Sequence, residues 1–129
     1  MMSEEKVLTK EIAEQYIADE YSVYLDEFTR IDDAAAESLA KYKGRLSLNG
    51  LTELSDAAAE SLSKHKGSIC LDGLTSLSDV AAESLAKHKG NLAFLGLTEL
   101  SDAAAESLSK HKGEIYVLKR WEKKIKEHR

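Results

Sequence analysis

Residues 51–67 read LTELSDAAAESLSKHKG, and residues 97–113 repeat the same seventeen letters. Between them, residues 74–90 read LTSLSDVAAESLAKHKG, and before them residues 28–44 read FTRIDDAAAESLAKYKG. Each segment begins 23 residues after the previous one. A fixed period of this length is typical of stacked repeat proteins, in which one unit buries its apolar face only against its neighbours. The sequence therefore predicts a solenoid.

Each unit is predicted to begin with a helix. In residues 51–73, Ser55 and Asp56 are favourable N-cap residues, and they stand immediately before an alanine-rich stretch. Alanine has the highest helix propensity of the amino acids. We therefore expect a helix of about three turns over residues 56–66, with its counterpart in every other unit.

A strand is predicted after each helix. Glu60 and Lys64 are spaced to pair on one helix face, and Gly67 is expected to end the helix in the left-handed conformation. Residues 68–72 then alternate polar and apolar side chains, as strands do. The matching strand segments in the other units are 45–49, 91–95 and 114–118.

The two ends of the chain depart from the repeat. Residues 1–27 are interpreted as a degenerate capping unit, with a first strand over 22–26. Residues 28–118 hold four repeats, and residues 119–129 are expected to form a helix that closes the far end of the core. The whole chain, residues 1–129, is predicted to be a single solenoid domain.

Written from the strand onward, the unit reads L-x-L-x-G-L-T-x-L-S-D-x-A-A-E-x-L-x-K-H-K-G, with Leu54-Ser55-Asp56 opening the helix. This pattern resembles the leucine-rich repeat, and within that family the cysteine-containing subtype. The resemblance implies an α/β fold: a short right-handed arc with a parallel sheet on its concave side and helices on its convex side. It also implies a protein-binding activity without chemistry.

Two features depart from that family. Leucine or phenylalanine stands where the family has asparagine or cysteine, at Phe28, Leu51, Leu74 and Leu97. The family's first leucine is replaced by the Lys-Gly helix end. We expect the threonine hydroxyls one residue later to bond the turn backbone instead, at Thr29, Thr52, Thr75 and Thr98.

Charge and composition limit the classes of partner. The net charge is −5, and it runs from −7 over residues 1–33 to +3 over residues 114–129. The repeats carry no basic stripe, so nucleic acid is not expected as a partner. No segment approaches the ~20 apolar residues of a membrane helix, so a membrane is not expected either. Cys70 is the only cysteine, which favours a cytoplasmic location.

Comparison of the repeats with one another predicts which surface binds. Strand positions expected to point inward stay apolar: Leu46, Ile69, Leu92, Ile115, Leu48, Leu71, Phe94 and Val117. Positions expected to point outward change chemistry freely. The predicted partner-binding residues are Tyr24, Arg45, Ser47, Cys70, Asn91 and Tyr116. Neutral variation on an unconstrained surface explains the same pattern.

Three side-chain groupings could carry chemistry. His65, His88 and His111 recur every 23 residues, which fits a metal site or a packed column near helix ends. Cys70 could be a nucleophile, but no histidine is expected on its face. Asp26 and Asp72 would lie two strands apart, at ~10 Å. We predict packing for the histidines, and neither catalytic nor metal-binding residues.

The first hypothesis is therefore a non-catalytic module that binds a protein of unknown identity through the strand face, without a cofactor. The alternative is a structural protein that associates with itself, its acidic first unit stacking on the basic last helix. A hydrolase or metal-binding protein is the weaker alternative. The near-identity of the repeats also fits either a recent duplication or a consensus design.

Overall fold

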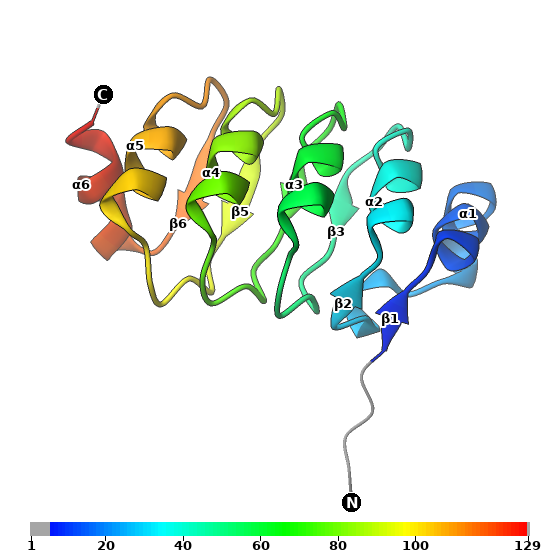
Figure 1. The fold of residues 1–129 in the computed structure, drawn as a ribbon. Coiled ribbons are helices and arrows are strands. Elements are labelled where there is room, and N and C mark those ends of the chain that lie inside the picture. Colours follow the sequence, from blue (N-terminus) through cyan, green and yellow to red (C-terminus); the bar gives the residue numbers. More distant parts are fainter. Residues whose placement is uncertain (1–5, 129) are drawn as a thin grey trace, which may run out of the picture.

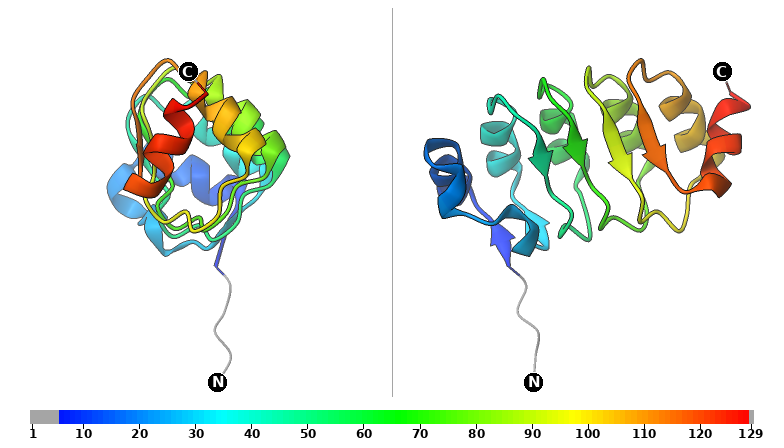
Figure 2. Two further views of the ribbon diagram at one scale, coloured as in Figure 1. Left: turned by 90° about the vertical axis from the view of Figure 1, so that its left-hand side faces the viewer. Right: turned by 180° about the vertical axis from the view of Figure 1, so that it is seen from behind.

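Helices and short parallel strands alternate along the chain, and the fold is of the α/β class. The computed structural model describes residues 6–128; residues 1–5 and 129 of the predicted end units lie outside the described residues. Figure 1 shows helices α2–α5 side by side in one row, and the right-hand view of Figure 2, seen from the opposite side, shows strands β3–β6 in front of them. The elements are β1 (Val7–Leu8), α1 (Lys10–Ala18), η1 (Glu20–Ser22), η2 (Leu25–Glu27), β2 (Arg30–Ile31), α2 (Asp33–Leu39), β3 (Leu46–Ser47), α3 (Asp56–Leu62), β4 (Ile69–Cys70), α4 (Asp79–Ala86), β5 (Leu92–Phe94), α5 (Asp102–Ser109), β6 (Ile115–Val117) and α6 (Lys119–Lys126).

The strands form two separate parallel sheets. In the larger sheet, β3, β4, β5 and β6 lie in chain order, and Leu46, Ile69, Leu92 and Ile115 occupy one register position. This register confirms the 23-residue alignment of the repeats. A second sheet pairs β1 with β2, with Val7 opposite Arg30. The regular strands are two or three residues long, shorter than the five predicted.

The strand predicted over residues 22–26 is wrong. Two 3-10 helices, η1 and η2, stand there instead. Local hydrogen bonds explain the difference: the Asp19 carboxylate accepts from the Tyr21 backbone N–H at 3.1 Å, and the Ser22 hydroxyl donates to the Asp19 carbonyl. Such local bonds compete with a sheet ladder. The sheet therefore begins one unit later than expected.

The repeat helices begin where the sequence predicts. The Ser55, Ser78 and Ser101 hydroxyls each accept from the backbone N–H three residues later, at 3.0 Å. The same hydroxyls donate to an aspartate of the preceding helix, as Ser78 does to Asp56 at 2.6 Å. One serine thus caps its own helix and ties it to the previous repeat.

These helices end earlier than predicted. Helix α3 stops at Leu62, and the His65 backbone N–H then bonds to the Leu62 carbonyl at 3.0 Å in a tighter turn. Lys64 therefore leaves the helix face, and no Glu60–Lys64 ion pair forms within residues 6–128. The left-handed conformation expected of Gly67 is also wrong, because no residue in this range has a positive φ.

The glycines instead allow neighbouring backbones to touch. A Cβ on Gly73 would lie 2.2 Å from the Asn49 carbonyl oxygen, and one on Gly90 would lie 2.4 Å from the Gly67 carbonyl oxygen. Real Cβ atoms do not approach backbone atoms so closely. The repeat requires glycine because only a residue without a side chain fits between successive turns.

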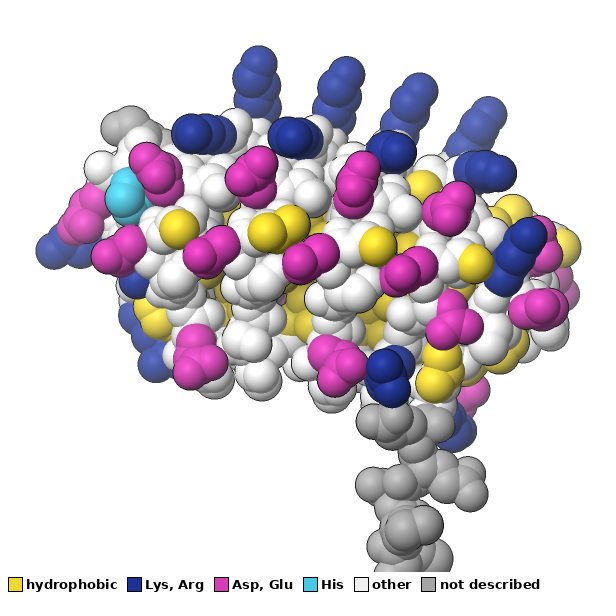
Figure 3. All heavy atoms as spheres, viewed as in Figure 1, with side chains coloured by type: hydrophobic (Ala, Val, Ile, Leu, Met, Phe, Trp, Pro, Cys, Tyr) yellow, Lys and Arg dark blue, Asp and Glu magenta, His cyan; other side chains and the backbone are white. Residues whose placement is uncertain are grey.

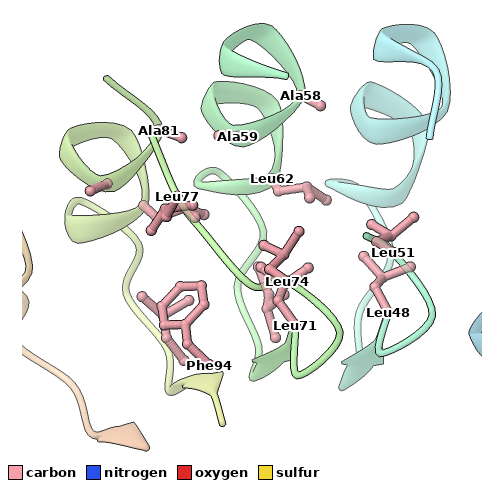
Figure 4. Close-up of a cluster of buried hydrophobic side chains, with 14 of the residues drawn as sticks. Leu48, Leu51, Ala58, Ala59, Leu62, Leu71, Leu74, Leu77, Ala81 and Phe94 are labelled. Atoms are coloured by element: carbon pink, nitrogen blue, oxygen red, sulfur yellow. The ribbon is translucent and has the colours of Figure 1, made fainter. Parts of the chain in front are cut away.

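Leucines from helices and strands fill the space between the two layers. Leu48, Leu71 and Phe94 are fully buried at equivalent positions of successive repeats, and Leu62 of α3 is fully buried in the same cluster (Figure 4). Seven of the eight predicted inward positions are buried, which confirms the face assignment. Ile115 is only partly buried, because no fifth repeat follows it.

Helix α6 packs against the last repeat. Ile125 is buried, the Trp121 indole N–H donates to the Leu97 carbonyl at 2.9 Å, and the Lys124 ammonium bonds the Leu100 carbonyl. Lys124 also forms a 3.0 Å ion pair with Asp102, and this pairing lowers the pKa of the Asp102 carboxyl. Among the described residues, no helix is long and apolar enough to cross a bilayer.

Candidate binding surface on the strand face

A pocket of about 450 Å³ lies on the strand face over β4, β5 and β6. Four of the six predicted binding residues line it: Arg45, Cys70, Asn91 and Tyr116. They come from successive repeats, and the parallel register places them side by side. Cys70 and Ala93 also line the pocket, and they occupy the same register position of the sheet as Tyr116.

Cys70 does not face open solvent as predicted. Its side chain is 7% exposed, although it lies outside the apolar core cluster. The Arg45 guanidinium shields it, with Nη2 donating to Cys70 Sγ at 3.2 Å. This contact raises the pKa of Arg45. The thiol is thus a covered part of the surface, held by a cation from the preceding repeat.

Ser47 and Tyr24 lie outside the pocket. The Ser47 hydroxyl donates to the Asp26 carboxylate at 2.9 Å, so it is half-buried in a structural contact. Tyr24 is 68% exposed and precedes η2, beyond the edge of the four-stranded sheet. The fold therefore places the six predicted residues in two groups.

The two aspartates that the sequence analysis grouped, Asp26 and Asp72, bond the backbone of the next repeat. Asp26 Oδ1 accepts from the Asn49 backbone N–H, and Asn49 Oδ1 accepts from the Asp72 N–H, each at 2.9 Å. Asp72 Oδ1 accepts from the Leu95 N–H at the same distance. This ladder follows one outward column and bonds each repeat to the next. Asp26 and Asp72 thus each accept a backbone hydrogen bond from the following repeat.

The expected threonine contacts form beside this ladder. Hydroxyls of Thr29, Thr52 and Thr98 donate to the carbonyl 23 residues earlier, at 3.5, 3.4 and 3.2 Å. These three bonds confirm the prediction that threonine supports the turn backbone. They lie beside the aspartate and asparagine ladder. At Thr75, the fourth predicted position, no such hydroxyl bond forms within residues 6–128.

Leu95 and Glu122 are among the pocket residues that were not predicted to bind a partner. Leu95 is 47% exposed at a position where the earlier repeats carry Asp or Asn, and Tyr116 beside it is 51% exposed. An apolar residue at an outward position was the signal that could have identified Leu95. Glu122 reaches the pocket from α6, where no repeat pattern marks it. Together these residues give the pocket apolar walls and both signs of charge at its rim.

The recurring histidines do not form a metal site. Their rings are stacked with centroids 6.1 Å apart for His65 and His88 and 6.2 Å apart for His88 and His111. Two nitrogen ligands of one zinc ion lie at most about 4 Å apart. Within residues 6–128, no three His, Cys, Asp or Glu side chains converge in a way that could hold an ion.

At the N-terminal end of the column, Tyr42 takes the place of histidine. Its hydroxyl donates to the Glu20 carboxylate, and its ring centroid lies 5.1 Å from that of Tyr16. The bond to Glu20 is the main cause that raises the pKa of Tyr42, with Tyr16 contributing. The first unit is thus fastened to the repeats by a polar contact that the histidine positions lack.

A scan of protein-family models, a search of curated proteins and a search of solved structures each found no match to this chain. The resemblance to leucine-rich repeats stays a prediction from the sequence pattern.

Proposed function

We propose that the chain is a leucine-rich-repeat-like solenoid that binds a protein partner through its strand face, without catalysis and without a cofactor. The pocket that brings Arg45, Asn91 and Tyr116 beside the exposed Leu95 is the observation that carries this proposal. Exposed aromatic, arginine and apolar side chains around a shallow hollow are typical of binding hot spots. The single thiol supports a cytoplasmic setting.

Repeat-to-repeat differences support the same surface. The buried helix positions hardly vary, whereas the pocket residues change from basic to polar to aromatic along the sheet. The structural ladder explains the conserved polarity at Asp26, Asn49 and Asp72, but nothing in the fold requires Leu95 or Tyr116. Side chains that the fold does not use are available for a partner.

The proposal can be tested with a randomised peptide library selected on the wild-type protein. Selected peptides should bind Tyr116→Ala and Leu95→Ser at least about tenfold more weakly, because those changes remove the apolar walls. Val80→Ser is the matched control, since Val80 is 56% exposed on α4, in the helical layer. Peptides that bind all three variants as tightly as the wild type would refute the strand-face site.

A second candidate is head-to-tail self-association. Helix α1 exposes Glu11 and Glu14 at one end of the molecule, while α6 exposes Lys119, Arg120 and Lys123 at the other (Figure 1). Opposite charges on opposite ends favour a heterologous contact that continues from copy to copy. This arrangement is the observation that favours an assembling role.

A further inference from the structure

A column of buried histidines runs along the edge where the repeat helices end. The side chains of His65, His88 and His111 are only 1%, 2% and 4% exposed. Neighbouring rings lie nearly parallel, at 2° and 8°. The Nε2 atom of each ring is buried without a hydrogen-bond partner among the described residues. A charge on any of these rings would therefore be poorly compensated.

Two of the rings, in their neutral form, also accept hydrogen bonds from the backbone. His65 Nδ1 accepts from the Gly67 N–H, and His88 Nδ1 accepts from the Gly90 N–H, both at 3.1 Å. An imidazolium carries protons on both nitrogens and cannot accept these bonds. The Gly90 carbonyl also lies 3.1 Å from His88 Nδ1, so a protonated ring would regain one contact there and still lose the N–H.

His111 is placed differently. Its Nδ1 lies 3.4 Å from the Ala86 carbonyl oxygen, and α6 covers the side that a fifth repeat would occupy. A proton on His111 Nδ1 can point to this carbonyl, and the ring loses no hydrogen bond from a backbone N–H when it carries that proton. The acid response should therefore be concentrated at His65 and His88.

Cations dominate the surroundings of the column. The pocket beside His65 is lined by one acid and four bases: Glu60, Lys64, Lys66, Lys87 and Lys89. The pocket beside His88 repeats this with Glu83, Lys87, Lys89, Lys110 and Lys112. The pocket beside His111 is mixed, with Lys112, Glu114, Glu122 and Lys126.

On the N-terminal side His65 meets the backbone of Tyr42 and Gly44. Figure 3 shows lysine and arginine side chains projecting in a row from this edge.

We propose that the histidine column is an acid-sensitive switch, in which protonation of His65 and His88 breaks their bonds to the glycine turns and loosens the stacking of repeats. The surrounding lysines and the stacked neighbouring ring repel the new charges, and the backbone groups that favour a charged ring offset only part of the desolvation. Each turn leads directly into a strand, and Asn91, which follows Gly90, lines the strand-face pocket. Loosening the turn therefore changes the shape of that pocket.

The sign of the pH effect follows from the burial. Desolvation lowers the pKa of His65 and of His88 below the ordinary value, with the neighbouring rings contributing at His88. Well above about pH 6.5, these two histidines are neutral in both the folded and the unfolded chain, so their protonation does not lower the free energy of unfolding. As the pH falls below that value, the unfolded chain binds protons that the folded chain excludes. Each excluded proton lowers the folded-to-unfolded ratio tenfold per pH unit.

The first test is an NMR titration of the wild-type histidine rings between pH 7.5 and 5. Free imidazole added to the same sample is the reference. His65 and His88 should titrate well below this reference, and the Gly67 and Gly90 amide protons should shift with them. Rings of His65 and His88 that titrate together with the reference in a folded protein would overturn the proposal.

The second test is urea unfolding over the same pH range, above the region where carboxylates titrate. Wild-type stability should fall from pH 6.5 to 5, by up to tenfold in the folding ratio per pH unit for each neutral ring. His65→Tyr, which copies Tyr42 of the first repeat, should lessen this slope, and His128→Gln should leave it unchanged. A wild-type folding ratio that is constant over this range would overturn the proposal even if His65→Tyr failed to fold.

Discussion

Glycine at the end of each repeat is required for backbone contact between repeats, not for a special φ angle. A Cβ on Gly67 or Gly90 would strike the carbonyl oxygen of the glycine one repeat earlier, at 2.7 or 2.4 Å. A Cβ on Gly44, whose repeat follows an irregular unit, would first meet the Tyr42 ring, at 2.8 Å. A ring can rotate away, but a stacked backbone cannot.

This difference predicts unequal effects of one substitution at matched positions. Gly90→Ala should lower the free energy of unfolding by about 2–3 kcal/mol, because the repeats must separate to admit the methyl group. Gly44→Ala should stay within about 1 kcal/mol of the wild type, since the loss of unfolded-state entropy offsets a small steric cost. Urea unfolding of both variants at neutral pH measures the difference. Equal losses would contradict the backbone-contact explanation.

In the outward column of Asp26, Asn49 and Asp72, the side chain of one repeat bonds the backbone of the next repeat. Asn49 carries no charge, yet its Oδ1 accepts from the Asp72 backbone N–H just as the Asp26 carboxylate accepts from the Asn49 backbone N–H. An oxygen acceptor at this position is therefore sufficient, and Asp and Asn interchange along the column. Where the acceptor is replaced by Leu95, the ladder ends and the surface becomes apolar.

Among the elements, the repeat helices depend on their first residue more than on side-chain pairs along them. Helix α4 is only eight residues long, below the length at which isolated helices are stable. Its N-cap Ser78 accepts from Ala81 and donates to Asp56 of the previous helix. The capping serine therefore acts on the helix and on the stack together.

Removal of the Ser78 hydroxyl should lower the free energy of unfolding by a measurable amount. Ser78→Ala is expected to cost about 1 kcal/mol or more of unfolding free energy, the usual cost of losing a capping residue. Ser76→Ala is the matched control: Ser76 is exposed two residues earlier and makes no hydrogen bond with any described residue. That change should have an effect below about 0.5 kcal/mol. Thermal and urea unfolding of both variants tests the expectation, and equal stability of the two would refute it.

The strands are the elements that the sequence described least well. Their five-residue polar–apolar alternation is present, but only two or three residues per repeat have regular strand pairing. Side-chain ladders hold the rest of each turn, as Asn49 does at the Asp72 N–H. The alternation of polar and apolar side chains predicts which residues are buried. It does not predict the length of the strand, because the same side chains are buried here with only two or three paired residues per repeat.

At the scale of the whole molecule, acidic residues are concentrated at one end and basic residues at the other. The acidic first unit and the basic α6 lie at opposite ends, while Lys124 and Asp102 join α6 to the last repeat (Figure 2). Exposed charged side chains on α1 and on α6 form the two end surfaces of the described residues. Charge complementarity between those surfaces is screened by salt over about 10 Å at 0.1 M.

Light scattering at low and high ionic strength tests the self-associating alternative. If the ends stack, the mass at low salt should exceed that of one chain and should fall as salt is added. Replacing Lys119, Arg120 and Lys123 with Gln should remove the association, because these side chains are exposed on α6. Replacing Lys64, Lys66 and Lys87 with Gln provides a control of equal charge change on the helix edge. A single-chain mass at every salt concentration would exclude the head-to-tail contact.

The sequence by itself determined the 23-residue unit, the helix starts at residues such as Ser78, and the inward leucines. Each of these depends on local propensity or on polarity that repeats with the chain. It also identified four of the residues around the pocket, because variation among repeats marks outward positions.

Only the tertiary structure decided how the units meet: the bond from Arg45 to Cys70, the stacked histidine rings, the close approach at Gly90 and the entry of Glu122 from α6. Those contacts join residues of different units, and their distances depend on how closely the backbones stack. A pattern within one unit specifies which side chains are buried, but the spacing between units is set by packing against the next copy.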